Sequence, residues 1–127
     1  MTELSSPHVR AQLINYLIGL ADVEYQLANW QIFNHDKNTY DEFDYTVHFL
    51  YDDTYLADNP ELAIGDSLYD QEEVQAVTAI ITVLEKIFGR YGLNLSDTAY
   101  IATPEWNEVI TSAKAALAVL RSHEPGP

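Results

Sequence analysis

One histidine lies between two aspartates at a spacing that could bring all three side chains together. Asp44, His48 and Asp52 are each four residues apart, so a helix would place them on one face. Imidazole nitrogens and carboxylate oxygens are ligands for divalent metals. A stronger signature such as His-Glu-x-x-His is missing, so metal binding, or a metal-dependent reaction, is the alternative hypothesis. The simpler interpretation is a histidine hydrogen-bonded to a neighbour, with a pKa that nearby carboxylates raise.

Other catalytic chemistry finds no support in the sequence. The chain has no cysteine, which removes thiol nucleophiles, and it lacks both Gly-x-Ser-x-Gly and a glycine-rich phosphate loop. Asp52 and Asp53 are neighbours, and neighbouring helical positions point about 100° apart, so these carboxylates do not face each other. The sequence predicts neither an enzyme nor a cofactor.

Acidic residues and tyrosines gather in one segment, 40–73. It holds eleven of the twenty acidic residues and five of the nine tyrosines, and no lysine or arginine occurs between positions 38 and 85. Tyrosine supplies a large contact area with a polar tip and is enriched where proteins bind each other. The segment is therefore predicted to bind a basic protein. The expected partner-binding residues are Asp44, Tyr45, Tyr51, Asp52, Asp53, Tyr55, Asp58 and Tyr69.

The net charge of −14 repels nucleic acid and anionic lipid, which argues against either as a partner. Two simpler explanations remain open: the charge can serve solubility alone, and a tyrosine ring can pack on the core while its hydroxyl reaches water.

The length of 127 residues predicts one domain, 1–127, with flexible ends at 1–6 and 122–127. No signal peptide and no apolar run of about 20 residues is seen, which favours a cytoplasmic protein without a membrane span.

Helical periodicity and capping residues predict an all-α domain of five or six helices. One long helix or a kinked pair is expected over 7–33, with a loop at 34–39. The segment 41–56 alternates like a strand but has no convincing strand to pair with, so helix is favoured. A short helix is expected over 60–68, and a central one over 71–88 that begins at the cap residue Asp70.

A short turn or helix should follow Ser96, and the last helix should begin at the Thr103-Pro104-Glu105 signature. That helix carries several alanines at 113–118, which would allow close packing against another helix. The same alanines could form the seam of a homodimer, so the chain is expected to be a monomer or a homodimer.

Several stretches of the chain resemble an uncharacterised family of small acidic bacterial proteins. They are 48–65 (HFLYDDTYLADNPELAIG), 100–106 (YIATPEW), 20–26 (LADVEYQ) and Trp30. The resemblance implies a helical, cytoplasmic bacterial protein and assigns no catalytic residue. In size and charge alone, the chain is also similar to the small immunity proteins that neutralise basic toxins. An immunity or inhibitor role toward a basic partner is the function that these features favour.

Overall fold

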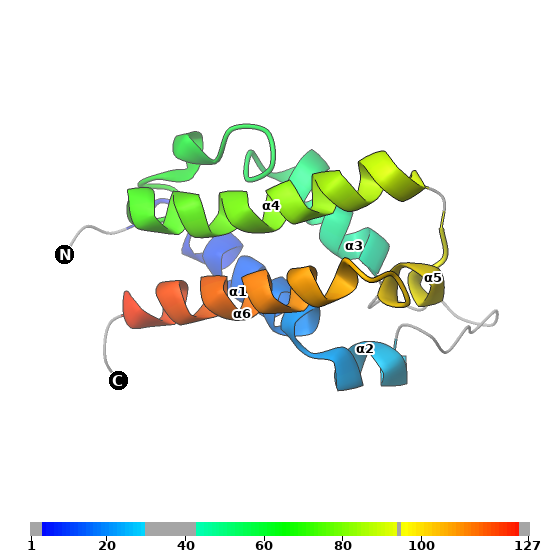
Figure 1. Cartoon of the computed structure of the whole chain (residues 1–127). Helices are drawn as coiled ribbons and strands as arrows, with labels where there is room; N and C mark the ends of the chain where they lie inside the picture. Colours follow the sequence, from blue (N-terminus) through cyan, green and yellow to red (C-terminus); the bar gives the residue numbers. More distant parts are fainter. Residues whose placement is uncertain (1–3, 30–42, 94, 125–127) are drawn as a thin grey trace, which may run out of the picture.

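The computed structural model describes residues 4–29, 43–93 and 95–124, with only the backbone described at Asn29 and Thr98. These residues form an all-α fold without a strand, as the periodicity predicted (Figure 1). The α-helices are α1 (Pro7–Ala21), α2 (Val23–Asn29), α3 (Phe43–His48), α4 (Gln71–Tyr91), α5 (Asp97–Ile101) and α6 (Trp106–Ser122). A π-helical turn, Phe49–Asp53, continues α3, and a 3₁₀ turn covers Pro60–Ala63. None of the described helices is both long enough and apolar enough to cross a membrane.

The helix α4 is the central element, and local chemistry sets both of its ends. Asp70 accepts a 3.1 Å hydrogen bond from the backbone N–H of Glu73, which caps the first turn. At the other end Gly92 has φ +84° and ψ −175°, a conformation that side chains with a Cβ disfavour, and its N–H bonds the carbonyl of Phe88. Between these ends the buried stripe expected from the sequence faces the core; it comprises Val74, Val77, Ile80, Ile81, Leu84 and Ile87.

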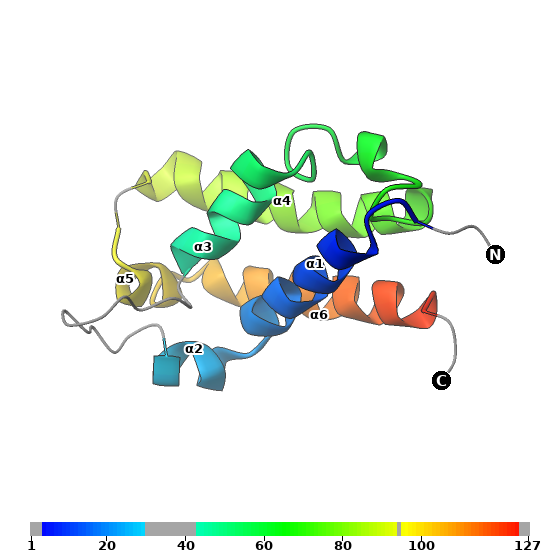
Figure 2. The same ribbon diagram turned by 180° about the vertical axis from the view of Figure 1, so that it is seen from behind.

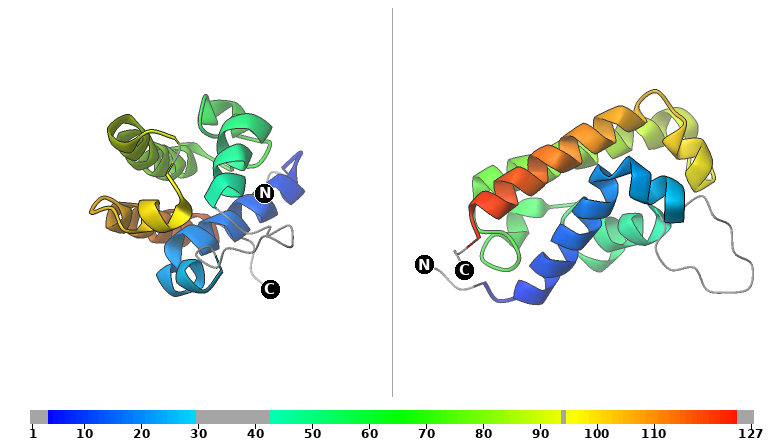
Figure 3. Two further views of the ribbon diagram at one scale, coloured as in Figure 1. Left: turned by 90° about the vertical axis from the view of Figure 1, so that its right-hand side faces the viewer. Right: turned by 90° about the horizontal axis from the view of Figure 1, so that it is seen from below.

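Three helices pack closely around this core. α6 runs antiparallel beside α4, and α1 packs against α6 (Figures 1 and 3). Small residues of α6 lie inside the contact, because Ala113 and Ala116 are fully buried. Ala115 and Ala118 are exposed on the outer face of the same helix. The alanine-rich segment is therefore divided between the core of this chain and its surface.

The kinked helix pair expected near the N-terminus is confirmed as far as Asn29. α1 ends at Ala21, and the side chain of Asp22 accepts a 3.0 Å hydrogen bond from the N–H of Tyr25 in the first turn of α2. An aspartate able to cap a second segment is thus the physical cause of the break. The remainder of that expectation, 30–33, and the expected loop at 34–39 lie outside the described residues.

The strand-like segment is helical over its described part, 43–53. Phe43, Thr46, Phe49 and Leu50 are buried, at intervals of three and one, so burial follows a helical spacing and not the alternation. After α3, the backbone forms a wider π-helical turn, and the helical segment ends at Thr54. Its hydroxyl lies 2.9 Å from the carbonyl oxygen of Phe49. π-helical turns are rare and occur often at functional sites.

Two expected helix boundaries are wrong. Only Pro60–Ala63 is helical in the segment expected over 60–68, because the N–H groups of Asp66, Ser67 and Leu68 all bond the single carbonyl of Ala63. Thr103 does not start α6: its hydroxyl bonds the carbonyl of Tyr100 at 2.7 Å, and the helix begins three residues later. In both places, local side-chain and turn hydrogen bonds displace the regular helical ladder.

The expected flexible ends make specific contacts where they are described. The N–H groups of Ser5 and Ser6 bond the carbonyls of Gly65 and Asp66 at 3.0 and 2.8 Å. His123 and Glu124 bond side chains of α4 and α1, as set out below. The described parts of both ends therefore lie at the same end of the molecule, where α4 begins (Figure 1).

Candidate functional site

A groove opens beside the C-terminal half of α4, and residues of α3, the π-helical turn and α5 line it together with α4. Figure 2 shows how α3, α4 and α5 are arranged. Its volume is about 820 Å³. The lining residues are Phe43, Asp44, Val47, His48, Tyr51, Asp52, Glu85, Phe88, Gly89, Leu93, Leu95, Asp97 and Tyr100. Binding sites of this size usually combine an apolar floor with a few placed polar groups.

Aromatic rings form the floor of the groove. Phe43, Phe88 and Tyr100 meet one another with ring centroids 5.3 to 6.0 Å apart, and two of these pairs are edge-to-face. Phe43 also packs edge-to-face on Trp106 at 5.0 Å, which connects the floor to the core beneath α6. Leu93 at the margin is 71% exposed. The floor is thus packed against the core, and its edge presents apolar surface to solvent.

The rim of the groove is acidic. Asp44, Asp52, Glu85 and Asp97 contribute four carboxyl groups, and no lysine or arginine is among the described residues that line the hollow. Two of the carboxyl groups already serve the fold. Asp97 accepts a 3.2 Å bond from the N–H of Phe43, and Glu85 accepts a 2.6 Å bond from the hydroxyl of Tyr51. Burial of the phenol and its bond to Glu85 raise the pKa of Tyr51 well above its ordinary value.

The sequence placed Asp44, His48 and Asp52 on one helical face, and the structure brings them together there. Nδ1 of His48 lies 2.5 Å from Asp52, and Nε2 lies 3.6 Å from Asp44. The hydrogen bond to Asp52, followed by the attraction of Asp44, raises the pKa of His48. Because the two carboxylates approach opposite ring nitrogens, one cation cannot meet all three groups without movement of these exposed side chains.

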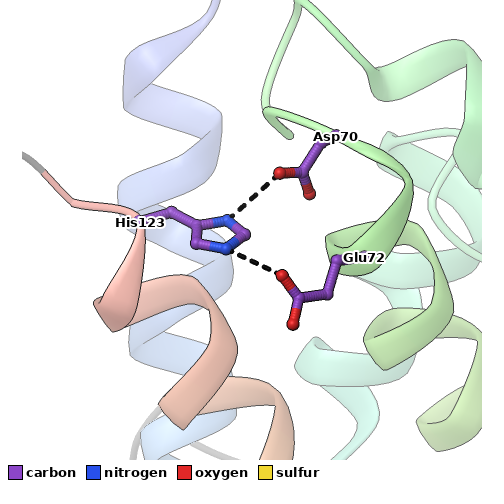
Figure 4. Close-up of side chains that lie close together, drawn as sticks. All are labelled: Asp70, Glu72 and His123. Atoms are coloured by element: carbon purple, nitrogen blue, oxygen red, sulfur yellow. Dashed lines mark hydrogen bonds and ion pairs between the residues drawn. The ribbon is translucent and has the colours of Figure 1, made fainter.

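A second charged group, the end cluster, lies at the opposite end of α4. It consists of Arg10, Asp70, Glu72, Glu73, His123 and Glu124. Within the described residues, Asp70, Glu72 and His123 are the group whose candidate metal-ligand atoms all lie within 4.8 Å of one another (Figure 4). This group could not be found from spacing, because His123 lies 51 positions beyond Glu72 and spacing reveals only ligands that share one element.

A buried ion pair fixes the end cluster to the core. The guanidinium of Arg10 binds both carboxylate oxygens of Glu73, at 2.7 and 2.9 Å, and both side chains are almost wholly inaccessible. Arg10 also donates to the carbonyls of Ser67 and Leu120 and to Glu124, and it lies over the ring of Tyr69 at 4.4 Å. Burial opposes the charge of Glu73, but the bond from Arg10 holds the pKa of that carboxyl below its ordinary value.

Comparison with known families adds one finding. A family model described as a domain of unknown function (DUF7945) matches residues 4–126. The chain belongs to this family. Comparisons with curated proteins and with solved structures gave no match. The family membership agrees with the resemblance to an uncharacterised family, and it names no activity, ligand or partner.

In this DUF7945 chain, the residues expected to bind a partner fall into separate places. Asp44, Tyr51 and Asp52 line the groove. Tyr45, Asp53 and Tyr55 are exposed outside it, with Tyr55 exposed to 61%. Asp58 borders a smaller hollow of about 420 Å³ between the 3₁₀ turn and α4, and Tyr69 packs on Arg10 in the end cluster. The acidic segment is thus not one continuous surface.

Other groove residues come from parts of the chain that the sequence analysis did not connect with the acidic segment. Glu85, Phe88, Asp97 and Tyr100 lie 41 to 56 positions after Asp44 in the sequence. In the sequence, Phe88 belongs to the helix predicted over 71–88, and Asp97 and Tyr100 belong to the short turn or helix predicted after Ser96. Only the packing of α3 against α4 and α5 shows that they share a hollow with Asp44.

Proposed function

We propose that this DUF7945 protein is an interaction module, of the immunity or inhibitor kind, that binds a basic protein partner in the groove. One observation carries the proposal: four carboxyl groups surround an aromatic floor in a hollow of about 820 Å³ whose described lining contains no lysine or arginine. A lysine or arginine side chain fits such a site well, since its apolar stem packs on rings while its charge meets carboxylates.

The arrangement separates two roles. The carboxylates of Asp44 and Asp52 are largely exposed, so they steer a basic partner toward the groove, and this steering weakens as salt is added. The half-buried ring of Tyr51 and the exposed side chain of Leu93 offer the contact area that slows dissociation. The π-helical turn supports this proposal, because two of its residues, Tyr51 and Asp52, line the groove.

Backbone amide NMR with a defined probe tests the proposal. The probe is an amphipathic peptide of leucine and lysine, titrated at low and at high salt beside a peptide in which glutamate replaces lysine. We expect the lysine peptide to shift the signals of groove residues, and the Asp44→Asn/Asp52→Asn variant to bind at least tenfold more weakly. The matched control is Asp58→Asn/Glu61→Gln, which removes the same charge at the smaller hollow.

The proposal would be contradicted if the Asp58→Asn/Glu61→Gln variant, and not the Asp44→Asn/Asp52→Asn variant, lost binding of the lysine peptide. Equal binding of the lysine and glutamate peptides would also contradict it. The alternative hypothesis, a metal-binding protein that uses His48 with Asp44 and Asp52, makes a different prediction. Zn²⁺ would then bind the wild-type chain at one equivalent and would fail to bind His48→Ala. The same spectra report that outcome, because the affected signals would belong to α3 and the π-helical turn and not to α4 or α5.

A further inference from the structure

His123 joins two elements through both of its ring nitrogens (Figure 4). It follows the last residue of α6, and its Nδ1 lies 2.8 Å from Oε2 of Glu73 and 3.5 Å from Asp70. Its Nε2 lies 3.0 Å from Oε1 of Glu72. All three carboxylates belong to the N-terminal end of α4. This side chain therefore bridges the end of α6 and the beginning of α4.

Both contacts together require a protonated ring. A neutral imidazole has one N–H and can donate to only one carboxylate, leaving a lone pair that faces the other carboxylate at hydrogen-bond distance. The imidazolium donates at both nitrogens and gains a charge-assisted bond at each. The remaining charged groups of the end cluster are Arg10, from α1, and Glu124, after the end of α6. With Arg10 and His123 charged, the cluster holds four carboxylates and two cations.

The two acceptors differ in their freedom to move. Glu73 is fully buried and is held by Arg10 and by the N–H of Tyr69, so it cannot turn away from His123. Glu72 has a side chain that is 64% exposed, and it can swing into solvent. Loss of the proton therefore leaves the bond from Nδ1 to Glu73 and breaks the one from Nε2 to Glu72.

We propose that His123 is a proton-operated clamp between the C-terminal end of α6 and the N-terminal end of α4. The clamp is closed when the imidazole is charged, and it loosens the last turn of α6 when the imidazole is neutral. It lies about 30 Å from the far end of α4 where the groove opens, the length of that 21-residue helix, so the clamp does not depend on the proposed partner site.

The direction of the pH dependence follows from the same contacts. Burial opposes the charge on the ring, but the bond to Glu73 and the attraction of Asp70 outweigh it and raise the pKa of His123 above its ordinary value. A raised folded-state pKa means that the contribution is fully present below about pH 6.5, the value of an unperturbed histidine. The contribution is lost as the pH rises through the folded-state pKa.

Two measurements on the wild-type protein test the clamp. Imidazole ¹⁵N and ¹H NMR across pH 5 to 9 gives the pKa of His123 and shows whether both nitrogens carry protons. Amide hydrogen exchange over 117–123, corrected for the intrinsic rate at each pH, reports the last turn of α6. We expect exchange there to rise roughly three- to tenfold as His123 loses its proton, the size of one partly exposed charged hydrogen bond.

Two variants sharpen the test. Glu72→Gln, at an exposed position, should lower the pKa of His123. The rise in amide hydrogen exchange over 117–123, here called the step, should then occur at lower pH. His123→Gln should abolish the step, whereas His48→Gln, the matched control at the other end of α4, should leave it unchanged. A pKa of His123 at or below the ordinary histidine value, or exchange without a step, would overturn the clamp. So would one equivalent of Zn²⁺ bound at pH 7 and lost in His123→Gln, because a metal ion would then operate the cluster.

Discussion

Trp106 and Gln26, 80 positions apart in the chain, are joined inside the core by a single hydrogen bond. The indole N–H donates to Oε1 of Gln26 at 2.8 Å, and both side chains are buried. The amide NH₂ of Gln26 in turn donates to the carbonyls of Gly19 and Leu20 at 2.8 and 3.0 Å. One buried amide thus joins the end of α1, the helix α2 and the beginning of α6.

Replacing Gln26 by Leu should therefore destabilise the protein strongly. The similar volume preserves packing, but the indole N–H of Trp106 and two helix-end carbonyls lose their partners in the core. An unsatisfied buried group costs about 1 to 3 kcal/mol, and we expect a loss in that range or above it in urea unfolding. Gln75→Leu, at an exposed position of α4, is the control and should change stability by about 0.5 kcal/mol or less. Equal stability of the two variants would refute the proposed role of the amide.

The ion pair of Arg10 and Glu73 makes a second prediction. Arg10→Met leaves a carboxylate buried without its partner, and the free energy of unfolding should fall by about 3 to 5 kcal/mol. The double variant Arg10→Met/Glu73→Leu removes both charges and should lose clearly less than the sum of the single changes. Lys86→Met breaks an ion pair with Glu108 whose side chains are half exposed, and it should change stability by about 1 kcal/mol or less. Additive losses at Arg10 and Glu73 would show that the pair is not coupled.

Sequence reasoning succeeded where a signal lies within one helix. The apolar stripe of α4 and its cap at Asp70 are local patterns, and the structure confirms them, while the helix runs three residues beyond its predicted end at position 88. The same holds for Asp44, His48 and Asp52, since four-residue spacing places them together on any helix. The choice of helix over strand for 43–53 was correct for a less local reason, the lack of a second strand.

What the sequence could not provide is contact between distant elements. The groove depends on Glu85 and Asp97 approaching Asp44, and the end cluster depends on His123 returning to α4 from 50 positions away. The spacing of residues along the chain does not show which distant elements pack against each other. The local rules failed where turn hydrogen bonds compete with a helix, as at Ala63 and Thr103. A proline after a possible cap residue indicates a turn as readily as a helix start.

His48 should titrate above the ordinary histidine pKa, and Asp52 should be the main cause. Its hydrogen bond is the largest influence and the charge of Asp44 comes second, so Asp52→Asn should lower the pKa of His48 more than Asp44→Asn. Because the folded-state pKa is raised, the contribution to stability is present below about pH 6.5 and disappears as the pH rises through the folded-state pKa. Side-chain NMR across pH 5 to 9 measures the pKa of His48 in the wild-type protein and in the two variants. A larger change with Asp44→Asn would reverse the assignment.

The two glycines at the end of α4 should respond in opposite directions to the same replacement. Gly92 combines φ +84° with ψ −175°, a region open to glycine almost alone, so Gly92→Ala should destabilise the protein by about 1 to 3 kcal/mol. Gly89 lies within the helix, is exposed, and a Cβ there would meet no atom within 4 Å. Gly89→Ala should therefore stabilise the protein by about 0.5 to 1 kcal/mol, because alanine loses less backbone freedom on folding. Thermal unfolding of the two variants, three residues apart and identical in chemistry, separates backbone conformation from every other influence. A loss of stability at Gly89 would mean that α4 ends before Gly89, and the C-terminal edge of the groove would then have to be redrawn.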